Sequence, residues 1–257
     1  MENEMNRSEG VGVNLSNDYI IEEDSTSLGS IKKMHHDIRK GTLIFAVFWF
    51  HSAKVEEPVN PPFDSTPKRI YREVEAANSI WRTPDGSRKI KFFQAYSNNL
   101  DSRLVNLTAE TLDDKEIEDL ISLGIEYYKS ADCFVFYIEG EKFNNGAVAR
   151  SFKRYRDNKE IYFIIMSNGA QARIEDGIKK GQDYTLAHEL GHIMYFSNYY
   201  GNTSDPNPNG SDIGHHNDDT PEEKRNLMSP VLVPNGQIPI ITEAQVIKAL
   251  QSKFFLD

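Results

Sequence analysis

The sequence predicts a mixed α/β (α+β) fold, in which helices pack against a twisted sheet with strands of both directions. Short apolar runs typical of buried strands alternate with segments whose apolar residues recur at helical spacing. The chain has 257 residues and is 39% hydrophobic, which is enough for one large domain with a substantial core. We expect this single domain to cover residues 41–257. The chain beyond residue 197 is rich in Asn, Asp, Gly and Pro, so we expect the C-terminal part of the domain to be rich in loops and to end in a helix.

The N-terminal segment, residues 1–40, is polar and mixed in charge, which is typical of an extension with at most local structure. The alternative is a propeptide whose carboxylates, or His35 and His36, reach the functional site. No signal peptide is visible, and the longest apolar stretch, Leu43–Phe50, is too short to span a bilayer. We therefore expect no membrane insertion, and a location in the cytoplasm or outside the cell by a non-classical export route.

The first half of the domain begins with a continuous apolar run over Thr42–Phe50, which predicts a buried strand. The proline-rich stretch Pro58–Pro67 predicts a loop. A helix is expected over Pro67–Trp81, because its apolar residues recur every three or four positions. A second strand is expected over Ile90–Tyr96, after a Pro-Asp-Gly turn.

The middle of the chain predicts one more helix and three more strands. The helix covers Asp113–Lys129, where apolar residues again form one stripe. Strands are expected over Cys133–Ile138 and Ile161–Met166, and Ala147–Phe152 is expected to form a strand at an exposed edge of the sheet.

The C-terminal part contains two expected helices separated by a long ordered loop. The first helix covers Asp183–Phe196 and is expected to lie against the centre of the sheet. The loop covers Ser197–Asn226. The last helix begins after Thr242, whose hydroxyl, together with Gln245, completes a capping box.

Composition excludes two classes of partner and one class of metal site. The net charge of −10 argues against nucleic acid, because neutralising phosphates requires a basic surface, and equally against an anionic membrane surface. Cys133 is the only cysteine, so an intrachain disulfide and a structural zinc site made of cysteines are excluded. Its apolar neighbours predict that Cys133 is a small buried core residue.

The segment His188–His192 has the pattern H-E-x-x-H within an expected helix. One helical turn separates His188 from His192, so both imidazoles leave the same face and can share one metal ion. Glu189 lies beside them, where its carboxylate can take a proton from a water held by that ion. The pattern therefore predicts a catalytic Zn2+ site with Glu189 as the general base.

A catalytic zinc takes a third protein ligand and leaves a fourth position open. Downstream of the motif, only His215 and His216 offer imidazoles, and they follow a loop able to fold back. We expect His215, directly after Gly214, to be the third ligand, with His216 as the alternative. A carboxylate ligand is the competing arrangement, and its candidates are Glu222, Glu223 and Glu243. Asp218 or Asp219 is expected to accept a hydrogen bond from a ligand imidazole and fix its tautomer.

The H-E-x-x-H helix, the later histidine pair and the segment Asn226–Pro230 together resemble the metzincin clan of zinc metallopeptidases. In that clan, a third histidine follows the helix, and a tight turn then places a methionine beneath the metal. The resemblance implies that Met228 is the methionine of this turn.

The clan's longer pattern, H-E-x-x-H-x-x-G-x-x-H, is not followed here. Its glycine position holds Tyr195 and its third-histidine position holds Asn198. The third ligand is therefore expected to arrive later, after an extended helix or an insertion.

These observations predict a zinc-dependent endopeptidase that hydrolyses protein or peptide substrates with one catalytic Zn2+ ion. The substrate is expected to lie extended along the edge strand near residues 147–151. Two alternatives remain open. One is a catalytically silent metal-binding or regulatory protein of the same fold, and the other is a protease effector or toxin with a narrow target.

Overall fold

The computed structural model describes residues 42–50, 53, 55, 58–60, 64–100, 107–175, 178–180, 183–231 and 237–255. The extension expected over residues 1–40, with His35 and His36, lies outside the described residues, as does His51.

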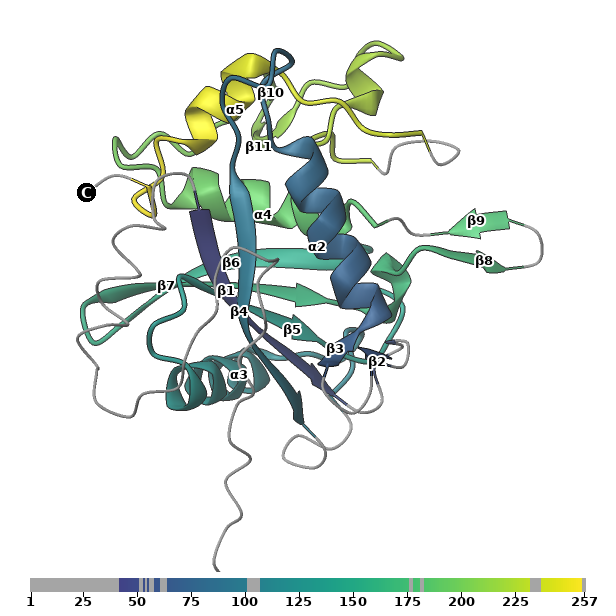
Figure 1. Ribbon diagram of the computed structural model, residues 1–257, viewed down its shortest axis with the longest axis vertical. Helices are drawn as coiled ribbons and strands as arrows, with labels where there is room; N and C mark the ends of the chain where they lie inside the picture. Colours follow the sequence, from purple (N-terminus) through teal and green to yellow (C-terminus); the bar gives the residue numbers. More distant parts are fainter. Residues whose placement is uncertain are drawn as a thin grey trace, which may run out of the picture.

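A five-stranded mixed sheet forms the centre of the fold (Figure 1), which confirms the predicted fold class. Its order is β4-β1-β5-β7-β6. The strands are β1 (Thr42–Phe50), β4 (Lys91–Leu100), β5 (Cys133–Tyr137), β6 (Ala149–Arg156) and β7 (Lys159–Met166). β4, β1, β5 and β7 are parallel, whereas β6 is antiparallel to β7 and forms one edge of the sheet.

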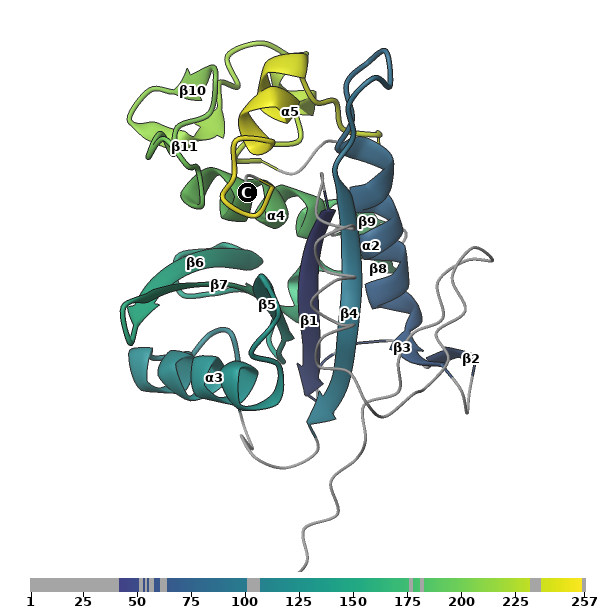
Figure 2. The ribbon, with the colours of Figure 1, turned by 60° about the vertical axis from the view of Figure 1, so that its left-hand side comes forward.

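Helices cover both faces of this sheet (Figure 2). α2 (Lys68–Ile80) and α4 (Thr185–Phe196) share a core with one face, while α3 (Asp114–Tyr127) packs on the other. The alternation along β1 explains the two cores, because Phe45 and Val47 belong to the first and Ala46 and Phe48 to the second. Both faces of the sheet are therefore apolar, as the continuous hydrophobic runs predict.

The motif helix α4 packs on β6 and β7 rather than against the centre of the sheet, so that prediction is wrong. α2 lies beside α4 in the same layer and also packs against β4, at the opposite edge. Two helices share this face, and each covers only part of it. This arrangement brings α4 next to the edge strand β6.

Two helices begin with a capping box, of which the sequence analysis predicted the one at Thr242. Asp113 caps α3 and completes a capping box with Glu116. Thr242 and Gln245 form the predicted capping box at the start of α5 (Glu243–Ala249). In both cases the signal lies within four residues of sequence, which is why the sequence carries it.

Three short hairpins lie outside the predicted strands, two of them in predicted loops. They are β2–β3 (Pro58–Asn60 with Asp64–Pro67), β8–β9 (Arg173–Glu175 with Ile178–Lys180) and β10–β11 (Pro208–Asn209 with Asp212–His216). Two 3-10 turns, η1 (Asn168–Ala170) and η2 (Glu223–Arg225), complete the described elements. Strands of two to five residues are too short for an alternating pattern to emerge from the sequence.

The edge strand β6 continues four residues beyond the predicted end at Phe152. It pairs with β7 as far as Arg156, opposite Lys159. Asp157 and Asn158, between these residues, have φ values of 50° and 59°, the left-handed conformation that a two-residue hairpin turn favours. This turn extends the pairing and gives the sheet a long free edge.

Among the described helices, none has the length and apolarity needed to cross a membrane.

Candidate metal centre

Three histidine rings converge above α4. In the part of the chain that the structure describes, His188, His192 and His215 form one group whose ligand atoms all lie within 4.8 Å of one another. His192 Nε2 lies 3.0 Å from His188 Nε2 and 3.2 Å from His215 Nε2. Tetrahedral zinc with Zn–N bonds of about 2.0–2.1 Å requires ligand nitrogens about 3.3 Å apart. The three imidazoles therefore fit one such ion.

Two of these rings have their other nitrogen fixed by a hydrogen bond. His188 Nδ1 donates to the carbonyl oxygen of Leu227 at 2.6 Å. His215 Nδ1 donates to Asp212 Oδ2 at 2.8 Å. Each bond places the proton on Nδ1 and leaves the lone pair of Nε2 directed at the centre of the cluster.

The carboxylate that orients a candidate ligand is Asp212, and not Asp218 or Asp219 as predicted. Asp218 accepts from the side chain of Asn209, and Asp219 accepts from the side chain of Asn217. Asp212 lies three residues before His215 on the same short hairpin strand, so local backbone geometry favours this pair.

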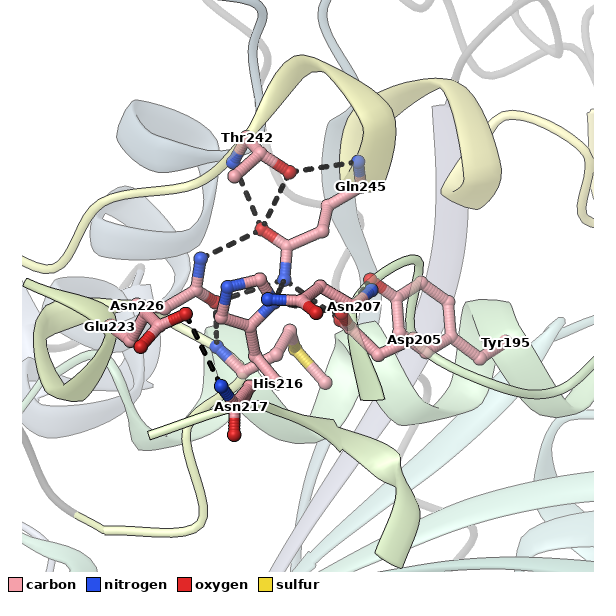
Figure 3. A network of polar contacts seen from close by, with 10 residues as sticks. Tyr195, Asp205, Asn207, His216, Asn217, Glu223, Asn226, Thr242 and Gln245 are labelled. Carbon is pink, nitrogen blue, oxygen red and sulfur yellow. Dashed lines mark hydrogen bonds and ion pairs between the residues drawn. The ribbon is translucent and has the colours of Figure 1, made fainter. Parts of the chain in front are cut away.

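His216 points toward Asp205 and Gln245 (Figure 3) and is not a member of the histidine group. Adjacent residues of a strand face opposite sides, and β11 carries both His215 and His216. His216 is buried, and its Nδ1 donates to Asp205 Oδ1 at 2.8 Å. The geometry therefore selects His215 of the two candidates. None of the proposed carboxylate ligands, Glu222, Glu223 or Glu243, belongs to the group of possible ligands found among the described residues.

The buried Asp205 carboxylate joins four segments of the chain (Figure 3). Besides His216, it accepts hydrogen bonds from the Tyr195 hydroxyl at 3.2 Å and from Gln245 Nε2 at 2.8 Å. Gln245 Oε1 in turn accepts from Asn226 Nδ2 at 3.0 Å. The network ties α4, the loop after it, β11 and α5 together, and so holds the strand that presents His215.

This network also explains the departure from the clan's longer pattern. α4 continues to Phe196, past the position where the pattern has glycine, and Tyr195 at that position is buried with its hydroxyl on Asp205. The third imidazole then comes from the hairpin β10–β11. The sequence prediction that the third histidine arrives late agrees with this geometry.

Met228 lies against α4 at Gly191. Its side chain is fully buried, and its backbone nitrogen donates to Asn226 Oδ1 at 2.9 Å. A methyl group on Gly191 would overlap Met228 Sδ and lie 2.7 Å from Trp81 Cζ2. Trp81 cannot retreat easily, because its indole nitrogen donates to the carbonyl of Ala187 at 2.9 Å. Gly191 thus allows the close approach of Met228 to the helix.

Replacing Gly191 with alanine is expected to destabilise the protein by up to about 2 kcal/mol, because an overpacking cost of about 1–3 kcal/mol exceeds the gain of about 1 kcal/mol in helix propensity. Denaturant unfolding followed by circular dichroism measures this change. The double variant Gly191→Ala/Met228→Ala serves as the control and should cost less than the sum of the two single variants, since removing Met228 relieves its clash with the new methyl group while the contact with Trp81 remains. A cost equal to the sum of the two single variants would show that Met228 and Gly191 do not share this space.

Glu189 is buried, and its side chain reaches the edge strand. Ser151 Oγ of β6 lies 2.5 Å from Glu189 Oε2 and 2.9 Å from the Glu189 carbonyl oxygen. Burial raises the pKa of Glu189 to about 7, while the Ser151 hydrogen bond and the charge of Arg150 oppose that rise. A carboxyl with such a pKa exchanges protons near neutral pH, as general acid–base catalysis requires. Sequence reasoning missed Ser151, because only the topology of the sheet places it beside α4.

Two imidazoles of the cluster, those of His188 and His192, resist protonation. Burial lowers the pKa of His188 to about 4, and burial together with the neighbouring His188 and His215 lowers the pKa of His192 well below its usual value. In the described residues, His192 Nδ1 is also the one fully buried side-chain nitrogen or oxygen without a hydrogen-bond partner. Neutral imidazoles are the form that binds a metal ion.

These depressed pKa values predict that the metal-free protein loses stability in acid. Below pH 6.5 the unfolded chain binds more protons than the folded one. The contribution of neutral His188 to the free energy of unfolding is therefore fully present above that pH and is lost as the pH falls toward 4. The measurement is the melting temperature from pH 7.5 to 4 in the Glu189→Gln background, which removes a carboxyl with the opposite pH dependence. Adding His188→Gln should make the melting temperature depend less on pH. An unchanged pH dependence would show that the pKa of His188 is not depressed in the folded protein.

Comparisons with known proteins identify no family. No protein-family model matches the chain, and no curated protein matches it. Among solved structures, the fold is similar to the crystal structure of metalloproteinase-II from Bacteroides fragilis, with a TM-score of 0.47 and 13% sequence identity. The similarity covers 83% of this chain and 53% of that one, so the present chain spans about half the length of its structural neighbour.

Proposed function

We propose that the protein is a zinc-dependent endopeptidase of the metzincin type. The observation that carries this proposal is the convergence of three imidazoles beside Glu189. His188 and His192 lie on the same helix as Glu189, and His215 comes from β11. His192 Nε2 lies 3.0 Å from His188 Nε2 and 3.2 Å from His215 Nε2. The buried Met228 beneath the same helix further supports the metzincin type, as the methionine of the turn.

When bound, zinc supplies a Lewis acid that polarises the scissile carbonyl and lowers the pKa of water to about 7. Glu189 takes the proton from the attacking water and then returns it to the nitrogen of the leaving amine. The Ser151 hydroxyl holds the Glu189 carboxylate at 2.5 Å, which keeps the base in one orientation during both transfers. His188 and His215 keep their Nδ1 protons on Leu227 and Asp212, so their Nε2 atoms remain available as ligands.

The substrate is proposed to add as a strand to the free edge of β6. In the described residues, β6 pairs only with β7, and its other edge is open to a peptide. Ser151 of this strand contacts Glu189, so a peptide backbone paired with β6 would pass beside the general base. The catalytic domain is proposed to comprise residues 41–257, with residues 1–40 as an extension that precedes it.

Cleavage of peptides after metal removal tests this function. The protein is treated with a chelator, dialysed, and assayed on a library of internally quenched peptides before and after adding one equivalent of Zn2+. We expect no cleavage without metal and full recovery with zinc. Zinc binding without any cleavage would instead favour a catalytically silent metal-binding protein, and cleavage that resists the chelator would exclude zinc catalysis.

A further inference from the structure

The edge strand β6 is strongly basic, although the chain as a whole carries a net charge of −10. Four of the eight residues in Ala149–Arg156 are cationic, and none is acidic. They are Arg150, Lys153, Arg154 and Arg156. This basic strand forms the sheet edge that contacts Glu189.

Three of these cations already have partners. Lys153 Nζ lies 3.0 Å from Glu160 Oε1. Arg156 Nη1 donates to Ser122 Oγ at 2.7 Å. Arg154 lies 4.0 Å from Asp114 and Glu118 of α3, both of which are exposed, so these two ion pairs contribute little.

Arg150 differs from the other three. It is partly buried, and its guanidinium lies 5.6 Å from the ring centroid of Phe143 and 4.8 Å from that of Phe152. Among the described residues, no carboxylate pairs with it. The two rings hold the planar guanidinium in place and leave its N–H donors free for a carboxylate.

Arg150 also lies close to the reacting region. It precedes Ser151, whose hydroxyl contacts Glu189, so by strand alternation its own side chain leaves the opposite face of the sheet, where Phe143 and Phe152 lie. A peptide strand paired with β6 would lie about 4.8 Å away, and its side chains on the same face of the sheet would be about 5 Å from the Cβ atoms of β6. An acidic side chain on that face can therefore reach Arg150.

We propose that Arg150 is a specificity-determining residue that binds a carboxylate of the substrate, so that the enzyme selects peptides with an acidic side chain near the scissile bond. This inference rests on the proposed peptidase function. Arg154 lies four residues further on, on the same face of β6, and only weak ion pairs occupy it. The preferred substrate therefore carries a second acidic residue four positions from the first.

Paired peptides that differ only by Glu or Gln at one position test the selection. A scan of this pair along an internally quenched peptide is assayed with the zinc-loaded full chain. At the position facing Arg150, we expect kcat/KM to be roughly tenfold higher for Glu than for Gln, the effect of one charge-assisted hydrogen bond. The difference should lie in KM, because Arg150 would contact a side chain and not the reacting atoms. Such a contact is equally strong in the ground and transition states.

Variants of Arg150 separate recognition from an effect on Glu189. Arg150→Gln should reduce the Glu-to-Gln ratio to about one, and Arg150→Glu should invert the preference toward Lys at the same position. Lys159→Gln is the matched control: it removes one exposed positive charge from the neighbouring strand and should leave the ratio unchanged. A ratio of one in the unmodified protein, or equal losses for both peptides in Arg150→Gln, would overturn the inference while leaving the peptidase function intact. Failure of the zinc-loaded protein to cleave any peptide would instead refute the peptidase function, and the inference with it.

Discussion

Replacing Glu189 with glutamine should lower kcat/KM by about 10²–10⁴-fold, the contribution of a positioned general base. Glutamine has nearly the same shape and can still accept the Ser151 hydrogen bond, but it cannot take up a proton at neutral pH. Zinc content and the melting temperature should therefore change little. Steady-state kinetics on a cleaved peptide, with metal analysis of the same sample, measure both parts of the prediction.

The control for this variant is Glu75→Gln, an exposed carboxylate on α2. It makes the same chemical change far from the histidine cluster in sequence, and it should retain full activity. If Glu189→Gln cleaved peptides at the original rate, the assignment of Glu189 as general base would be wrong.

The adjacent histidines His215 and His216 should have opposite consequences when each is replaced with alanine. His215→Ala removes one of three proposed ligands and should weaken zinc binding by more than about 100-fold, the upper end of what outer-shell partners contribute. Its effect on folding should be small, since its side chain is 24% exposed and outside the buried network.

His216→Ala should instead destabilise the fold, by about 1–3 kcal/mol, because it leaves the Asp205 carboxylate short of a donor in a buried position. Zinc affinity follows from competition with a chelating dye, and stability from denaturant unfolding. If His216→Ala abolished zinc binding in a fully stable protein while His215→Ala retained it, the assignment of the third ligand would be reversed.

The sequence predicted most of the central sheet and its helices, because these elements depend on local patterns. The continuous apolar run of Thr42–Phe50 predicted β1 with both of its ends, an apolar stripe predicted α3, and a capping box predicted the start of α5. The extra length of β6 was missed, since it depends on the left-handed Asp157-Asn158 turn rather than on hydrophobic alternation. Short polar hairpins such as β10–β11 were missed for the same reason.

The histidine cluster could be predicted where its residues are close in sequence. His188 and His192 follow from helical spacing alone, whereas the choice between His215 and His216 depends on which face of β11 the Asp205 network holds inward. Ser151 lies 38 residues before Glu189, and their contact arises only because α4 packs beside the edge strand. Contacts of this kind depend on tertiary topology and leave no local signal in the sequence.

Zinc K-edge X-ray absorption on the full chain, loaded with one equivalent of Zn2+, tests the central claim most directly. We expect a single tightly held ion with three imidazole nitrogens at about 2.0–2.1 Å and one oxygen ligand. The signal of one imidazole should disappear in His215→Ala. A protein that retains no zinc, or a coordination shell with fewer than three imidazoles, would contradict the proposed zinc site of three histidines.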